Sequence, residues 1–256
     1  MKKILVSVLA VLVVMLSLCS CTQRSGGYKV LNLPKELSID AGALSEDADN
    51  LLNMDEDYPL LLAKPEDDLF VYAVNPSVMQ GVVVKFGGLL QYFPWEFIPQ
   101  LAQPEAFVYD YDGDGQKDIA LTYVEESASP RFNETLHVLL YAKKGMQDCI
   151  YTYEKAASEA GNHIMVEKKS AKDYVVYVDG VEKPFSMQKN YGEFLGVYTQ
   201  TVQDFTLGET ISVAVNPGLV FDKTQEPVYS AFRYRAQVTL VGETLTQIKS
   251  EVVFGN

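Results

Sequence analysis

The stretch EAFVYDYDGDGQKDIALTYV, residues 105–124, places an acidic loop between two strand-like runs. The runs EAFVY (105–109) and DIALTYV (118–124) are rich in Val, Ile, Phe, Tyr and Thr, which suit half-buried strands. Between them lie Gly113 and Gly115, and glycine permits the sharp backbone turns that a short connection needs. The stretch therefore predicts a β-hairpin whose turn carries several aspartates.

Similar short runs recur from Asp68 onward and are separated by Gly, Pro, Asn and Asp. Side-chain alternation is clear in several of them, because Ile119, Leu121 and Tyr123 share one face, a pattern typical of strands. The sequence predicts strands at about 69–74, 82–87, 89–93, 106–111, 118–125, 135–143, 148–154, 163–168, 174–179, 184–188, 195–203, 209–215, 228–241 (interrupted) and 245–254. We therefore expect an all-β fold class of mainly antiparallel hairpins, as a sandwich or as an irregular propeller-like or barrel-like arrangement.

Turns and one helix complete this pattern. Asp179-Gly180 lies between two strand-like runs and is a strong hairpin signal, and VGET at 241–244 resembles it. Leu136, Val138 and Leu140 should share one strand face. A helix of one or two turns is possible at 153–160, and we expect no long helix after residue 60.

The N-terminus has the features of a secretory signal. Lys2 and Lys3 precede the apolar run ILVSVLAVLVVMLSL, residues 4–18, which is shorter than the ~20 residues of a membrane-spanning helix. The run ends in LCSC, residues 18–21, with an aliphatic residue three before the cysteine and a small residue directly before it. This sequence resembles the lipobox of bacterial lipoproteins.

The resemblance implies that Cys21 becomes the mature N-terminus and is acylated, for example with palmitate. Acyl chains contribute about 0.8 kcal/mol per buried methylene, so two or more anchor a protein to membrane lipid stably. The expected location is the cell membrane, on its extracytoplasmic side. An ordinary signal peptide and a freely secreted protein are the alternative. The predicted organisation is a signal peptide (1–20), a lipidated tether with a loosely packed lead-in (21–57), and one β-rich domain (58–256).

Charge and cysteine content narrow the functional classes. The chain has 34 acidic and 21 basic residues and a formal charge of −13, which becomes −15 once Lys2 and Lys3 leave with the signal peptide. Such a surface repels nucleic acid, whose binding requires clustered Lys and Arg. After processing, Cys149 is the one thiol that remains, so no intramolecular disulfide can form, and we expect Cys149 to be a buried small apolar residue.

The acidic loop has the spacing of a calcium ligand set. Asp110, Asp112, Asp114 and Asp118 occupy positions 1, 3, 5 and 9, and Gln116 at position 7 can offer its backbone carbonyl. These donors are hard oxygens, which favour calcium over zinc or copper. An acidic turn that binds nothing is the alternative. A bound calcium ion is expected to stiffen the hairpin rather than to take part in a reaction.

The loop is not an EF-hand, because position 12 is Leu121 instead of Glu and the flanks are strand-like rather than helical. It resembles the Asp-x-Asp-x-Asp-Gly-x-x-Asp loops of FG-GAP and VCBS-type repeats, and most closely the single such loop of poorly characterised extracytoplasmic lipoproteins. In those proteins a second strand pairs back after the loop, as residues 135–141 could do here. Several loops are the rule in family propellers, so a single loop argues against a regular propeller.

Other residues give weaker signals. His137 should face solvent or a neighbouring strand, and the aromatic segment 87–99 around Trp95 should be core or a strand-edge plug rather than a glycan-binding face. The chain has no nucleophile elbow, zinc-protease motif or phosphate loop. We therefore expect a binding or accessory module, with a protein or glycan partner. The alternatives are an envelope- or glycan-directed hydrolase and a regulatory partner of a membrane protein.

Overall fold

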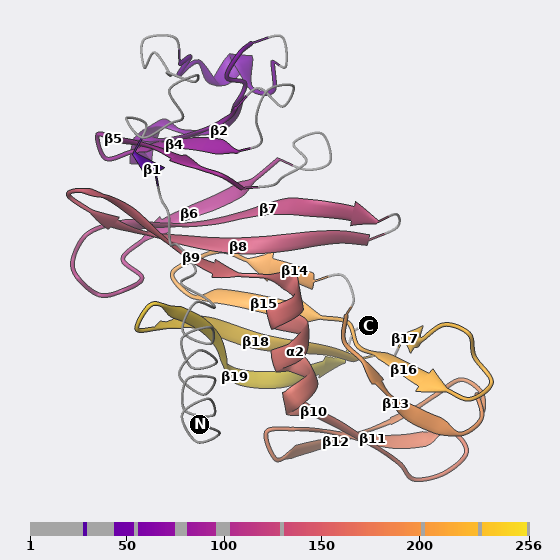
Figure 1. The fold of residues 1–256 in the computed structure, drawn as a ribbon. Coiled ribbons are helices and arrows are strands. Elements are labelled where there is room, and N and C mark those ends of the chain that lie inside the picture. The colour runs from indigo at the N-terminus through magenta and orange to yellow at the C-terminus, as the bar shows by residue number, and fades with distance from the viewer. Residues whose placement is uncertain are drawn as a thin grey trace, which may run out of the picture.

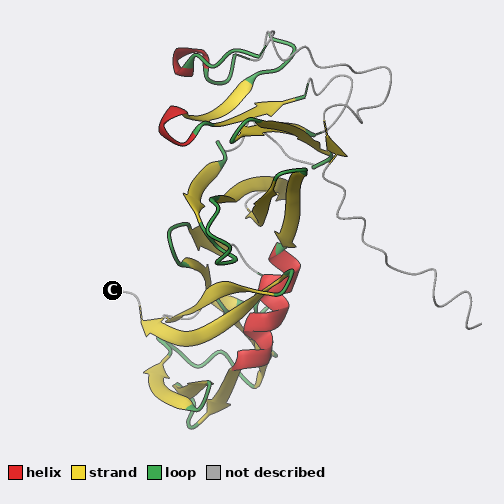
Figure 2. Cartoon of the chain, turned by 90° about the vertical axis from the view of Figure 1, so that its left-hand side faces the viewer, coloured by secondary structure: helices red, strands yellow, loops and turns green. Residues whose placement is uncertain are grey.

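The computed structural model describes residues 28–29, 44–53, 56–74, 81–95, 103–128, 131–200, 203–229 and 232–254. Among these residues the chain forms five antiparallel sheets, none of them closed into a barrel, so the predicted all-β fold class is confirmed. Figure 1 and Figure 2 show the sheets stacked one after another along the molecule. The signal segment and Cys21 lie outside the described residues. No helix in the described part of the chain has the length and apolar character needed to cross a membrane.

The first layer is a five-stranded sheet. Its strands, in spatial order, are β1 (Tyr28–Lys29), β5 (Leu89–Phe93), β4 (Val82–Phe86), β3 (Leu69–Ala73) and β2 (Leu60–Lys64). Every residue of β3 is buried. Leu69 and Val71 face one core while Phe70 and Tyr72 face another. A continuously apolar strand of this kind forms when both faces of a sheet are covered.

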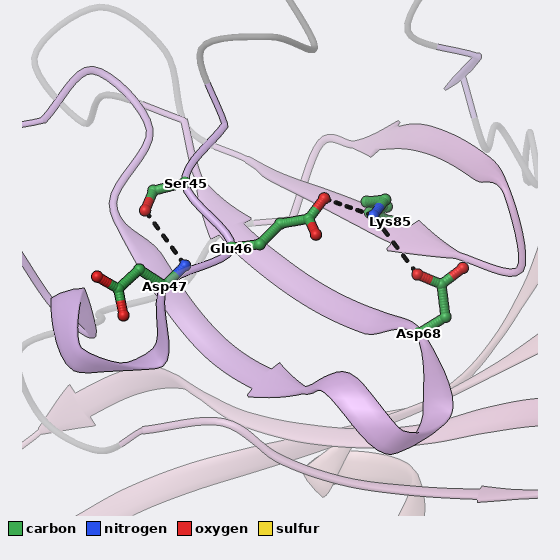
Figure 3. Close-up of polar contacts among 5 residues, drawn as sticks. All are labelled: Ser45, Glu46, Asp47, Asp68 and Lys85. Atoms are coloured by element: carbon green, nitrogen blue, oxygen red, sulfur yellow. Dashed lines mark hydrogen bonds and ion pairs between the residues drawn. The ribbon is translucent and has the colours of Figure 1, made fainter.

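Part of the predicted lead-in covers the outer face of this sheet. A short 3-10 helix, η3 (Ala48–Asn50), lies beside it. Figure 3 shows Lys85 of β4 between two carboxylates, with Nζ 2.6 Å from Glu46 Oε1 and 3.4 Å from Asp68 Oδ1. Exposed ion pairs contribute ~0–1 kcal/mol, so these contacts orient the segment more than they stabilise it.

The central layer is a four-stranded sheet dominated by one long hairpin. Its strands, in spatial order, are β6 (Glu105–Tyr109), β7 (Asp118–Ala128), β8 (Arg131–Ala142) and β9 (Gly145–Tyr151). Ile119, Leu121 and Tyr123 share one face, as predicted, and this face packs on the first sheet. Leu136, Val138 and the partly buried Leu140 share one face of β8, as predicted, and this face packs on the C-terminal layers. This sheet therefore separates two hydrophobic cores.

The C-terminal layers contain a four-stranded sheet and two three-stranded sheets. The four-stranded sheet has the order β14 (Gln203–Thr206), β15 (Ile211–Val215), β18 (Phe232–Val241), β19 (Thr244–Phe254). One three-stranded sheet has the order β10 (Ile164–Lys168), β11 (Asp173–Val178), β12 (Val181–Ser186). The other has the order β13 (Phe194–Tyr198), β16 (Gly218–Phe221), β17 (Val228–Tyr229). All of them contribute apolar side chains to one core.

Helix α2 (Tyr153–His163) packs between the central sheet and the C-terminal layers (Figure 1). Thr152 caps its N-terminus, because the Thr152 hydroxyl accepts a hydrogen bond from Lys155 N at 3.3 Å. The helix presents small alanines to the core, so it approaches the strands closely. Glu159 on this helix accepts hydrogen bonds from Gln247 N at 2.9 Å and Tyr151 OH at 2.7 Å, which ties α2 to β19 and β9. The helix predicted at 153–160 is thus present and extends by three residues.

Both predicted two-residue turns are confirmed. Val178 pairs with Val181 across Asp179-Gly180, and Val241 pairs with Thr244 across the second turn. Asp179 and Gly180 have φ of 48° and 80°, the positive values that such a turn requires.

Candidate metal centre

The acidic loop connects β6 to β7. The ladder between these strands ends at the pair Tyr109–Asp118, and residues 110–117 form the connection. A short connection between two ladder-paired strands holds the ends of the loop in fixed positions. The predicted strand–loop–strand hairpin is confirmed.

Three of the predicted ligands converge. Carboxylate oxygens of Asp110, Asp112 and Asp118 all lie within 4.8 Å of one another. Asp112 is exposed, Asp110 is half-buried and Asp118 is buried. The cluster therefore lies at the surface, with one carboxylate anchored in the sheet.

Backbone hydrogen bonds shape the loop around Asp110. The Asp110 carboxylate accepts one bond from Gly113 N at 2.8 Å and another from Gly115 N at 2.9 Å. Both glycines have positive φ, 78° and 86°, and a Cβ atom at either would meet nothing within 4 Å. The glycines are therefore required for the left-handed backbone and not for lack of space.

Asp118 connects the loop to the hairpin. Its carboxylate accepts hydrogen bonds from Tyr111 N at 2.9 Å and from Tyr141 N, at the end of β8, at 2.8 Å. Burial raises the pKa of this carboxyl group, and the hydrogen bonds from the two amides oppose that rise. A buried carboxylate held by two amides is fixed in orientation, as a metal ligand should be.

The remaining two predicted ligands pair with each other. Asp114 Oδ1 accepts a hydrogen bond from Gln116 N at 2.7 Å, and Asp114 Oδ2 accepts one from the Gln116 side-chain amide at 2.8 Å. Asp114 is not part of the converging cluster. It lies in the same loop, but its carboxylate is directed to the loop backbone.

The donor set fits calcium. The converging atoms are all carboxylate oxygens, the hard ligands that calcium prefers. Within the described residues, no lysine or arginine forms an ion pair with Asp110, Asp112 or Asp118, and the neighbouring Lys117 contacts Asp67 at 3.0 Å instead. Three close carboxylates without a counter-charge repel one another, and a divalent cation relieves that repulsion.

A second polar cluster involves His137, which contacts the neighbouring strand β9, one of the two settings predicted for it. His137 is buried, with Nδ1 2.8 Å from Asp148 Oδ1, and Trp95 Nε1 donates a hydrogen bond to Asp148 Oδ2 at 2.7 Å. The Trp95 ring also lies 4.1 Å from the imidazole, centre to centre. The alternation of β8 places His137 on the same face as Leu139, so the signal was present in the pattern.

Two other expectations are met. Trp95 is in the core, stacked on Phe93 and Tyr123, although the following residues 96–99 lie outside the described part of the chain. Cys149 is buried, and burial raises the pKa of its thiol to about 11, so the thiol is unreactive near neutral pH.

No protein-family model, curated protein or solved structure matches this chain.

Proposed function

We propose that this protein is a membrane-anchored extracytoplasmic lipoprotein that acts as a binding or accessory module and contains one structural calcium site. The observation that carries the proposal is the convergence of the Asp110, Asp112 and Asp118 carboxylates in a hairpin turn. The lipobox-like sequence ending at Cys21 supports the location.

A bound calcium ion would act on structure. Asp118 accepts hydrogen bonds from amides of the loop and of β8, so a cation held by Asp118 and the two loop aspartates would tie the loop to the central sheet. Extracellular calcium modules bind at ~10⁻⁴–10⁻³ M, a range that suits an external site. Asp114 and Gln116 lie in the same loop and complete the predicted ligand set.

The hydrolase alternative requires a cavity with paired carboxylates outside the loop. The two cavities beside the C-terminal sheet are each lined by a single acidic residue from outside the loop, Glu209 in one and Glu251 in the other. Apart from the loop residue Asp110, neither cavity has two carboxylates of its own, so no specific observation favours the hydrolase alternative over the binding module.

Thermal unfolding of the intact chain in detergent tests the calcium site. Calcium at about ten times its dissociation constant stabilises a protein by ~1.4 kcal/mol, which corresponds to roughly 3–6 °C for a chain of this size. We expect millimolar calcium to raise Tm relative to EGTA, and Asp112→Ala to abolish the rise. Asp57→Ala, an exposed aspartate outside the loop, is the matched control and should retain it. An equal response of the Asp112 variant and the wild type would contradict the site.

Membrane fractionation tests the anchor. The Cys21→Ala variant should move from the membrane fraction to the soluble fraction, because it lacks the acylated cysteine. Unchanged membrane association of the variant would contradict lipid anchoring through Cys21.

A further inference from the structure

Two cavities lie next to each other on the four-stranded C-terminal sheet. The first, of about 260 Å³, is partly open and lies between the acidic loop and strands β15, β18 and β19. The second, of about 590 Å³, is more open and lies over the same strands. Both are lined by Thr210, Gln237 and Lys249. The three shared residues make the two cavities direct neighbours, and we call the pair the β18 groove.

The acidic loop forms one wall of the β18 groove. Tyr109, Asp110 and Tyr111 line the first cavity. The Tyr111 hydroxyl donates a hydrogen bond to Gly208 O at 2.8 Å, which ties this wall to the turn before β15. Tyr109 is 38 % exposed and contacts the Tyr111 ring edge-on, with 5.6 Å between ring centres. Whatever fixes the acidic loop therefore also fixes this wall.

A β-bulge shapes the opposite side of the groove. The register between β18 and β19 shifts after the pair Arg235–Glu251 and resumes at Gln237–Ile248, so β19 contains an extra residue. Lys249, inside the bulge, has φ of 50°, which is uncommon for a residue other than glycine. Bulges redirect side chains and occur often beside functional sites. Here the bulge brings Lys249 to the lining of both cavities.

Two cations, Arg235 and Lys249, line the second cavity beside a single carboxylate, Glu251. The side chains of Arg235 and Lys249 form no hydrogen bond or ion pair with any described residue, although Arg235 lies opposite Glu251 in the β18–β19 ladder. The neighbouring Arg233 lies 3.8 Å from Asp204, and Lys183 donates to Val252 O at 2.6 Å. In a chain of formal charge −13, a cavity lined by two cations and one carboxylate is locally positive and offers a site for an anionic group.

The other lining side chains suit a sugar. Thr210, Ser212, Gln237 and Thr239 offer hydroxyl and amide groups that can both donate and accept hydrogen bonds, as sugar hydroxyls require. Tyr109 adds an exposed ring with an apolar face and a polar tip. β19 lines both cavities and is the last strand of its sheet, so an acidic peptide is the competing ligand that the test must exclude.

We propose that the β18 groove binds an acidic glycan, with sugar carboxylates paired to Arg235 and Lys249 and a sugar ring packed on Tyr109. The inference rests on the proposed function, because it supplies the ligand class for the binding module. It also assigns the calcium loop a role in binding, since calcium would neutralise Asp110 and fix Tyr109 and Tyr111 in the wall. By reciprocity, the glycan should then raise the affinity for calcium.

Calorimetric titration of the intact chain in detergent, with 1 mM calcium, tests the groove. The acidic probe is a tetrasaccharide of alternating glucuronic acid and N-acetylglucosamine. A tetramer of N-acetylglucosamine is the neutral control, and a hexaglutamate peptide is the non-sugar control. We expect the acidic tetrasaccharide to bind with Kd below about 1 mM and at least tenfold more tightly than either control, because charge-assisted bonds need the carboxylate and the hydroxyls together.

Substitutions in the groove identify the residues. Arg235→Gln and Lys249→Asn should each weaken binding by about tenfold or more. Asparagine is chosen at position 249 because it tolerates positive φ. Lys223→Gln removes an exposed cation outside the groove and should change Kd less than about twofold. Tm of each variant in the absence of sugar shows that it is folded.

Four results overturn the proposal: no binding of the acidic tetrasaccharide at about 10 mM, equal binding of the neutral tetramer, preference for hexaglutamate, or affinity unchanged by both groove substitutions. Measuring Tm with and without calcium separates the calcium-site proposal from the groove proposal. If calcium raises Tm but no sugar binds, the groove assignment fails and the calcium site stands. If the sugar binds through Arg235 and Lys249 without any calcium effect on Tm, the groove stands and the calcium site fails.

Discussion

Glu134 is a carboxyl group that the fold holds in an unfavourable setting. It lies on β8, and burial raises its pKa from 4.5 to about 7, with further contributions from Asp204 and Glu105. A hydrogen bond from the Phe205 backbone amide opposes the rise. Folded Glu134 therefore holds a proton more tightly than the unfolded chain does.

Protonation of Glu134 should make stability depend on pH. Between about pH 4.5 and 7 the folded state binds more protons than the unfolded state, so the free energy of unfolding falls as pH rises through this window and is level above it. The partial exposure of the side chain reduces the effect to ~1–2 kcal/mol. Urea unfolding in EGTA at pH 5 and pH 8 measures it.

Glu134→Gln should remove most of this fall, because the amide does not titrate. The comparison with the wild type isolates Glu134 from Asp118, whose pKa is also raised by burial. An identical pH dependence in the variant would show that Glu134 is not responsible.

At the scale of the element, side-chain alternation and turn chemistry predicted most strands. The hairpins at Asp179-Gly180 and at the acidic loop form as expected, because their turns need positive φ and their flanks alternate. β2, with the sequence LLLAK, was missed because it has no alternation and follows an acidic segment. β16 was missed because its ladder begins at Gly218, directly after a proline.

The predicted strand at 195–203 is wrong in one respect, since the chain divides there between two sheets. β13 ends at Tyr198, and the Thr199 hydroxyl then donates a hydrogen bond to Ala157 O of α2 at 2.8 Å. β14 begins at Gln203 in a different sheet. Local composition does not predict that the chain passes from one sheet to another here, because the contact that redirects it is made by a helix about forty residues earlier.

The two candidate sites also differ in whether local sequence or contacts between distant segments form them. The acidic loop could be predicted because its carboxylates are adjacent in sequence, although the pairing of Asp114 with Gln116 could not. The β18 groove could not be predicted from the sequence, because Tyr109 of β6 is far along the chain from Arg235 and Lys249 of the β18–β19 hairpin and meets them only through the layering of the sheets. A bulge, not a motif, redirects Lys249.

At the scale of the whole molecule, the central sheet links two cores. Leu139 and Trp95 belong to the core on one face of this sheet, while Val138 and Cys149 belong to the core on the other. Successive residues of β8 alternate between the two cores, so neither core can lose β8 without exposing the other. We therefore expect the first sheet, the central sheet and the C-terminal layers to unfold together.

Two natural probes can test this cooperativity. Trp95 fluorescence reports on one core, and the reactivity of the Cys149 thiol reports on the other, in a chain with Cys19 and Cys21 replaced by serine. The two urea transitions should coincide, as they do in two-state unfolding. Leu139→Ala should lower both midpoints equally, by an amount equivalent to about 2–5 kcal/mol, although Leu139 contacts only one core. If the Cys149 midpoint stays in place while the Trp95 midpoint falls, the layers are independent units and the central sheet does not couple them.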